Sequence, residues 1–142
     1  MTDAVKSNNP ATVERIGTRQ YKARNSKGAE LLIGYEEGQF SPGDLIKLAI
    51  LGCNALSSDA RFARALGDDY KLTGSVDTMY SKAEDRFTEF MVELEPAINF
   101  MDPDDRERLL ERAAGAIRRY CTISHTVAQS APTSITIDGD KQ

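Results

Sequence analysis

Hydrophobic and polar positions alternate along this chain with two different periods. Five segments are predicted as β-strands: 12–23, 29–35, 70–80, 87–94 and 133–137. The two-residue alternation is clear in 70–80, less clean in 87–94 and weak in 12–23. The turn signal Asn25-Ser26-Lys27-Gly28 separates the first two segments, and residues 81–85 separate the next two. The pattern therefore predicts two hairpins and one short final strand.

A longer segment between the two hairpins has the period of a helix. Ser41 stands where an N-cap belongs, Pro42 fits the first helical position, and Asp44 stands where a capping box places its acid. The helix is predicted to run to about Leu66 and to end at Gly67. Its first half is apolar nearly all round, which favours a buried helix. The face expected to point inward comprises Leu45, Ala49, Cys53, Leu56, Ala60 and Ala63.

A second helix is predicted from Asp102, its N-cap, to about Tyr120. Its expected inward face comprises Leu110, Ala113, Ala114, Ile117 and Cys121. The order strand, strand, helix, strand, strand, helix, strand interrupts antiparallel pairs with helices, so the fold class is α+β. With 142 residues, the chain suits one domain, predicted over 12–138, with a flexible tail over 1–11 and a polar tail over 139–142.

Charge and hydropathy narrow the range of partners. The net charge is −4 and there is no run of lysine or arginine, so nucleic acid is not expected as a partner. The longest apolar stretch, 45–56, is too short to cross a bilayer, so no membrane partner is expected. Residues 1–10 contain no apolar segment typical of a secretion signal. We therefore expect a cytoplasmic protein.

The two cysteines, Cys53 and Cys121, are the main candidates for chemistry. Each lies on the face of its helix that is predicted to point inward. In a reducing compartment they are not an obvious structural disulfide. They fit three descriptions, namely small apolar core residues, catalytic thiols or ligands. A zinc site with His125 would need a spacing such as CxxC or HxxxH, and neither occurs, so no metal is expected. His125 is expected to be a surface or structural residue.

Two segments resemble the signature of the OsmC/Ohr family, the osmotically inducible and organic-hydroperoxide-resistance proteins. FSPGDLIKLAILGCNAL is similar to the start of the family's central helix, and RYCTIS is similar to its second cysteine motif. The order of elements from about Val13 to Ile137 is also similar, and the motifs look closest to the OsmC-like branch. The resemblance implies an OsmC-like fold, with an antiparallel sheet, a long central helix and a second helix, in an intertwined homodimer.

The resemblance also implies an activity. Cys53 matches the family's peroxidatic cysteine, which attacks a hydroperoxide and becomes a sulfenic acid, and Cys121 matches the resolving cysteine. The implied partners are an organic hydroperoxide or another small hydrophobic ligand and an external dithiol reductant, with no bound cofactor. An arginine of the first hairpin stands near the thiolate in the family. Arg19 occupies the matching place, with Arg15 and Arg24 as rivals because one step of register in a strand reverses a side chain.

One position departs from the family pattern. Gly43 stands where the peroxidase members carry a glutamate that pairs with the arginine. Asp44 lies roughly half a turn away from Cys53 around the helix, and is expected to cap it. Glu36 and Glu37 could supply a carboxylate, although nothing singles them out. The departure keeps an alternative open, an OsmC-fold protein that binds a small ligand or senses oxidants with little peroxidase turnover.

Overall fold

The computed structural model describes residues 3–142. It divides into two compact units, residues 1–46, of which 3–46 are described, and residues 47–142. The boundary falls in the first turns of α1 (Pro42–Leu66). Helices and small antiparallel sheets together confirm the predicted α+β class.

The first unit contains a three-stranded antiparallel sheet in the order β1-β2-β3. Its strands are β1 (Thr12–Gly17), β2 (Gln20–Arg24) and β3 (Glu30–Ile33). The single strand predicted over 12–23 is therefore wrong, because the chain reverses between Gly17 and Gln20, which face each other across the turn. Arg19 lies in this turn with φ +57°, in the left-handed region. The turn at Asn25 to Gly28 is confirmed, and Gly28 has φ +85°.

The start of α1 follows the predicted capping box. The Asp44 amide donates to Ser41 Oγ at 3.0 Å, and the Ser41 amide donates to Asp44 Oδ2 at 3.0 Å. At the other end, Gly67 has φ +96° and its amide donates to the Ala63 carbonyl at 2.8 Å. Local sequence thus sets both ends of this helix.

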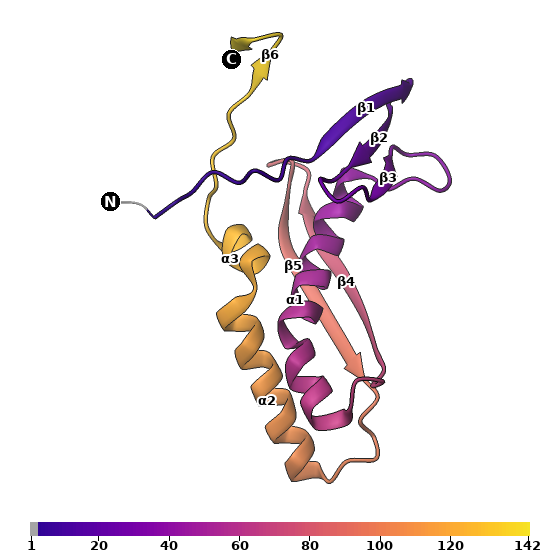
Figure 1. Cartoon of the computed structure of the whole chain (residues 1–142), viewed down its shortest axis with the longest axis vertical. Coiled ribbons are helices and arrows are strands. Elements are labelled where there is room, and N and C mark those ends of the chain that lie inside the picture. Colours follow the sequence, from indigo (N-terminus) through magenta and orange to yellow (C-terminus); the bar gives the residue numbers. More distant parts are fainter. Residues whose placement is uncertain (1–2) are drawn as a thin grey trace. The chain divides into compact units, whose positions relative to one another are not determined.

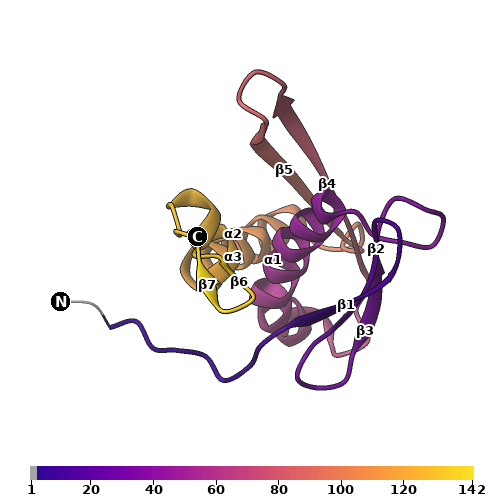
Figure 2. The same cartoon turned by 90° about the horizontal axis from the view of Figure 1, so that it is seen from above.

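In the second unit, α2 (Pro103–Tyr120) runs alongside α1, as both views show (Figures 1 and 2). A buried cluster joins the two helices: Phe62, Ile98, Leu109 and Ala113. The hairpin of β4 (Leu72–Ser81) and β5 (Arg86–Pro96) packs on α1. A Cβ on Gly74 would come within 2.9 Å of Leu51 Cδ1, which shows how closely β4 approaches the helix. Both strands are confirmed, with a bulge at Met79/Tyr80.

The buried stripe of α1 differs from the predicted one. The buried residues recur every four positions: Ile50, Asn54, Ser58 and Phe62. Leu56, predicted to be inward, is 79 % exposed. The prediction of a helix is therefore confirmed, but the face predicted to be buried is wrong. The face that is buried contains two polar residues, which a hydrophobic pattern excludes. On α2 the inward positions Ala113 and Cys121 are confirmed.

The C-terminal region also departs from the prediction. A short helix, α3 (Thr122–Ala128), follows α2 directly and was not predicted. The final strand is shorter than expected, β6 (Thr136–Ile137), and it pairs with β7 (Asp140–Lys141) inside the segment predicted as a polar tail. The predicted N-terminal tail includes residues 1 and 2, which lie outside the described residues.

The cap of α1 generates a stability prediction. Replacing Ser41 with alanine removes the hydroxyl that accepts the Asp44 amide, so we expect the free energy of unfolding to fall by about 1 kcal/mol. Urea denaturation followed by circular dichroism measures the change. The matched control is Ser134→Ala in an exposed loop, which should leave the midpoint unchanged. Equal midpoints for the two variants would contradict the role of the cap.

Candidate active site

Cys121 lies at the junction of two helices in the second unit. Its backbone amide donates to the Ile117 carbonyl at 3.0 Å and so closes α2. Its Sγ accepts a hydrogen bond from the Ser124 amide at 3.4 Å, in the first turn of α3. The side chain is 0 % exposed. The thiol is therefore held from both sides by backbone and is sealed from solvent.

Asn54 brings α1 to this junction. Its Nδ2 donates to Cys121 Sγ at 3.3 Å and to Ser124 Oγ at 3.1 Å. Asn54 is buried, and a buried amide is costly unless its donors are satisfied, so these two bonds fix the α1 stripe against the start of α3. Ser58, one turn further along, is fully buried and donates to the Asn54 carbonyl at 2.9 Å.

Cys53 precedes Asn54 and stands at the edge of the same stripe. It is half-buried, whereas Cys121 is sealed. The Cys53 side chain lies close enough to Cys121 to lower the pKa of that thiol, and Cys53 Sγ lies 4.0 Å from Ser57 Oγ. Both thiols are free. The fold thus brings together two cysteines that are 68 positions apart in the sequence (121 − 53).

The surroundings of Cys121 change the acidity of its thiol. Burial raises the pKa of the Cys121 thiol, but donors around the sulfur lower it by more. These donors are the Ser124 hydroxyl, the Cys53 side chain, the Ser124 amide and the Asn54 amide. The net result is a pKa below the usual value for cysteine, because the hydrogen bonds stabilise the negative sulfur.

Arg19 lies in the other unit, so its position relative to Cys53 stays a prediction. Its guanidinium stacks on the ring of Tyr35, 5.3 Å from the ring centroid. Both residues line a cavity of about 320 Å³ together with Tyr21, Ile33, Gly34 and Pro42. Gly34 permits the close approach of the Arg19 turn, because a Cβ there would lie 3.2 Å from the Arg19 carbonyl oxygen.

Arg24 and Arg15, the two other candidates for the arginine near the thiolate, lie in different surroundings from Arg19. Arg24 forms ion pairs with Glu14 and Glu30 across the sheet, and Glu30 is the main cause that raises the pKa of the Arg24 guanidinium. Arg15 lies in β1 opposite Tyr21. Only Arg19 of the three lines the apolar cavity.

The remaining candidates take structural positions. Asp44 caps α1, as expected from its place in the capping box. Glu36 and Glu37 are exposed in the loop before the helix. His125 is exposed, and its Nε2 lies 2.7 Å from the Arg118 carbonyl oxygen, so it connects α3 to the last turn of α2.

Within residues 3–142, no three His, Cys, Asp or Glu side chains are grouped so as to hold a metal ion. No helix in that range is long and apolar enough to cross a membrane.

Comparison with known proteins shows where the chain belongs. No family model matches the sequence. An uncharacterized protein of Mycobacterium tuberculosis is 33 % identical over 127 residues, covering 88 % of this chain and 93 % of its own length. Its counterpart in Mycobacterium bovis matches equally well. This chain belongs to the family of these mycobacterial proteins.

Solved structures identify the fold. An OsmC-like protein of unknown function from Vibrio cholerae superimposes with a TM-score of 0.68 at 13 % identity, over 88 % of this chain and 96 % of its own. The organic hydroperoxide resistance protein OhrB of Bacillus subtilis superimposes with a TM-score of 0.54 at 17 % identity, over 84 % and 90 %. The fold is that of the OsmC and Ohr proteins. The resemblance drawn from the two cysteine motifs is thereby confirmed for the fold.

Within this OsmC-like fold, sequence reasoning missed Asn54 and Ser124. A signal for Asn54 was present, because an amide inside the apolar run LAILGCNAL must find partners when the helix is buried. Ser124 carried no such signal, since α3 itself was not predicted. Both residues touch the sulfur of Cys121, so they belong to the site.

The Asn54 bond generates a prediction on acidity. Replacing Asn54 with alanine removes a donor that lowers the pKa of Cys121, so the pKa should rise. Thiolate absorbance against pH, measured in a Cys53→Ser background, follows Cys121 alone, and the serine hydroxyl can still donate to it. Ser57→Ala in the same background is the control, because Ser57 contacts Cys53 and not Cys121 in the structure. An unchanged Cys121 titration in the Asn54 variant would show that the amide bond does not act on the thiolate.

Proposed function

We propose that this protein is a thiol-dependent peroxidase that reduces organic hydroperoxides with Cys53 as the attacking thiol and Cys121 as the resolving one. The observation that carries the proposal is that two free thiols lie near each other, with Asn54, the residue after Cys53, bonded to Cys121 Sγ. A disulfide requires two cysteines whose Cα atoms lie within about 7 Å, so the proposal requires the pair to approach that closely. The reaction suits a reducing compartment such as the cytoplasm, where both thiols start reduced.

Exposure supports this division of roles. A hydroperoxide must reach the sulfur that it oxidises, and Cys53 is only half-buried whereas Cys121 is 0 % exposed. The lowered pKa of Cys121 favours a thiolate beside the Cys53 thiol. The Cys121 thiolate is the form that attacks the sulfenic sulfur of Cys53, so the lowered pKa suits the resolving role.

The proposed cycle balances at each step. The Cys53 thiol loses its proton to solvent and its thiolate attacks the hydroperoxide. The O–O bond breaks, Cys53 becomes a sulfenic acid, and the alkoxide takes a proton from solvent and leaves as an alcohol. The Cys121 thiolate then attacks the sulfenic sulfur, which forms the disulfide and releases hydroxide, protonated by solvent to water. An external dithiol reduces the disulfide to the two thiols and is itself oxidised to a disulfide. No bound cofactor takes part in this scheme.

Arg19 is proposed as the group that holds the peroxide oxygen. A guanidinium is always charged and donates in a fixed fork, which suits an oxygen that becomes negative as the O–O bond breaks. Its cavity is walled by Tyr21, Ile33 and Tyr35, side chains that favour an organic substrate over hydrogen peroxide. The Bacillus subtilis and Elizabethkingia anophelis proteins of the same fold are named for organic hydroperoxide resistance, which agrees with this choice.

One observation favours a second candidate function. Gly43 stands where the resemblance places the glutamate that pairs with the arginine in the peroxidase members. The loss of that glutamate would make turnover slow although the thiol pair still oxidises. The protein would then act as an oxidant sensor or bind a small hydrophobic ligand.

A homodimer is part of the proposal. The β4–β5 sheet has two strands, and a two-stranded hairpin in water is marginally stable by itself. Met79 and Met91 are 54 % and 40 % exposed on it. Open strand edges and exposed apolar side chains are the features that a second copy of the chain would cover.

The peroxidase proposal is tested by thiol loss after adding one equivalent of an organic hydroperoxide to the reduced protein. In the native chain both thiols should disappear, faster than a free thiol in solution. Cys53→Ser should abolish fast oxidation, and Cys121→Ser should stop at a sulfenic acid that a dimedone-type reagent traps. Native oxidation no faster than that of a free thiol would exclude the peroxidase. Fast disulfide formation without turnover in the presence of a dithiol would select the sensor.

The dimer is tested by the dependence of the melting temperature on protein concentration. A dimer that dissociates on unfolding gains stability by mass action, so Tm should rise as concentration rises. Sedimentation equilibrium should give twice the chain mass of 15.6 kDa. A monomer mass with a constant Tm would contradict the dimer.

A further inference from the structure

The second unit contains a cleft between its two long helices that the thiol chemistry does not use. Its volume is about 590 Å³. It is lined by residues from the second half of α1, from the segment before α2, and from the first half of α2: Arg61, Arg64, Ala65, Met101, Asp105, Arg108, Leu109 and Arg112. Cys53 lies eight residues before Arg61, roughly 12 Å away along α1. The cleft is therefore separate from the cysteine pair.

Four of the eight lining residues are arginines, and a single carboxylate faces them. Asp105 forms an ion pair with Arg108. Within residues 3–142, Arg61, Arg64 and Arg112 form no ion pair, although the chain as a whole has a net charge of −4. Like charges gathered in one place repel each other, so an acidic protein that concentrates its arginines here has an uncompensated positive field.

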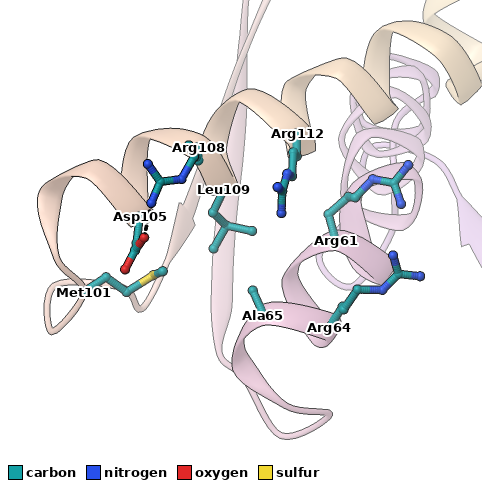
Figure 3. A pocket seen from close by; sticks show the side chains of 8 residues that line it. All are labelled: Arg61, Arg64, Ala65, Met101, Asp105, Arg108, Leu109 and Arg112. Atoms are coloured by element: carbon teal, nitrogen blue, oxygen red, sulfur yellow. Dashed lines mark hydrogen bonds and ion pairs between the residues drawn. The ribbon is translucent and has the colours of Figure 1, made fainter.

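The arrangement of the side chains suits a ligand with several anionic oxygens. Figure 3 shows Arg61 and Arg64 leaving the same side of α1, with their guanidinium ends turned away from that of Arg112. Arg112 reaches from α2 into the space between the helices, and Arg108 is turned toward Asp105. Guanidinium forks bind phosphate oxygens in pairs, which a lone cation cannot do. Arg61 and Arg64 together can hold one phosphoryl group, and Arg112 can hold the anionic oxygens of a second.

The rest of the lining indicates that the ligand also has an organic part. Ala65, Met101 and Leu109 form an apolar floor between the helices (Figure 3). The volume lies within the roughly 300–1,000 Å³ of small-molecule sites and exceeds what inorganic phosphate would fill. We propose that this arginine cleft binds a phosphorylated small organic molecule, with the phosphoryl oxygens on Arg61, Arg64 and Arg112 and the organic part on the apolar floor.

The charges around the cleft argue against a long nucleic acid. On the neighbouring face of α2, Glu107 and Glu111 line a second groove with Arg106. A polynucleotide leaving the cleft would run over these carboxylates, whereas a compact anion would not. The site is thus suited to one or two phosphoryl groups.

The test is isothermal titration of the reduced full-length protein with adenosine diphosphate, pyrophosphate and inorganic phosphate. We expect the nucleotide to bind most tightly, because it alone uses the apolar floor, and inorganic phosphate to bind most weakly. The double variant Arg61→Gln/Arg112→Gln should lose at least about tenfold in affinity for the nucleotide, since each lost charged bond is a substantial part of the binding free energy. Arg112→Lys keeps the charge without the fork and should lose less.

The matched control is Arg118→Gln/Arg119→Gln, which removes the same charge from exposed positions of α2 outside the cleft. This control should bind as the native chain does. Equal losses in both double variants would show non-specific attraction and overturn the proposal, as would absence of binding to all three probes. The proposal would also be overturned if the cleft variant kept its affinity but changed its sedimentation mass, because the arginines would then join copies of the chain. Circular dichroism confirms that each variant is folded.

Discussion

The site depends on a single constraint, that the amide of Asn54 must be satisfied where it is buried. It projects from the middle of α1 among apolar neighbours and finds its partners in Cys121 and Ser124. Since an unpaired buried amide costs roughly 1–3 kcal/mol, α1 and the α2–α3 junction are held in one register. That register brings Cys53 next to Cys121. The proximity of the two cysteines is thus a consequence of how a polar side chain is accommodated in the core.

The same arrangement gives the two sulfurs different properties. Cys121 ends one helix and begins the next, so backbone and side-chain donors gather around it and lower its pKa although it is buried. Cys53 stays at the edge of the stripe and keeps access to solvent. This difference suits a reaction in which the accessible sulfur of Cys53 meets the oxidant. The buried sulfur of Cys121, with its lowered pKa, then closes the disulfide.

The two long helices of the second unit contact each other through different kinds of side chain at their two ends. Near the α2–α3 junction the contact between the helices is made by thiols, a hydroxyl and an amide. Towards the other end the helices are joined by Phe62, Leu109 and Ala113, and arginines line the cleft beside this cluster. The cluster lies at the same level of the helices as the arginines, since Leu109 belongs to the cluster and also lines the cleft.

The sequence by itself determined the features that depend on neighbouring residues. The capping box of α1, the glycine that ends it, the N-cap of α2 and the β4–β5 hairpin were all predicted correctly, because their interactions span only a few positions. The two motifs also indicated the OsmC-like fold. Tertiary structure decided the rest. The buried face of α1 is set by its partners and includes Asn54 and Ser58, which no hydrophobic pattern selects. The turn at Arg19, the helix after Cys121 and the gathering of arginines from α1 and α2 likewise depend on residues far apart in the chain, whose proximity only packing creates.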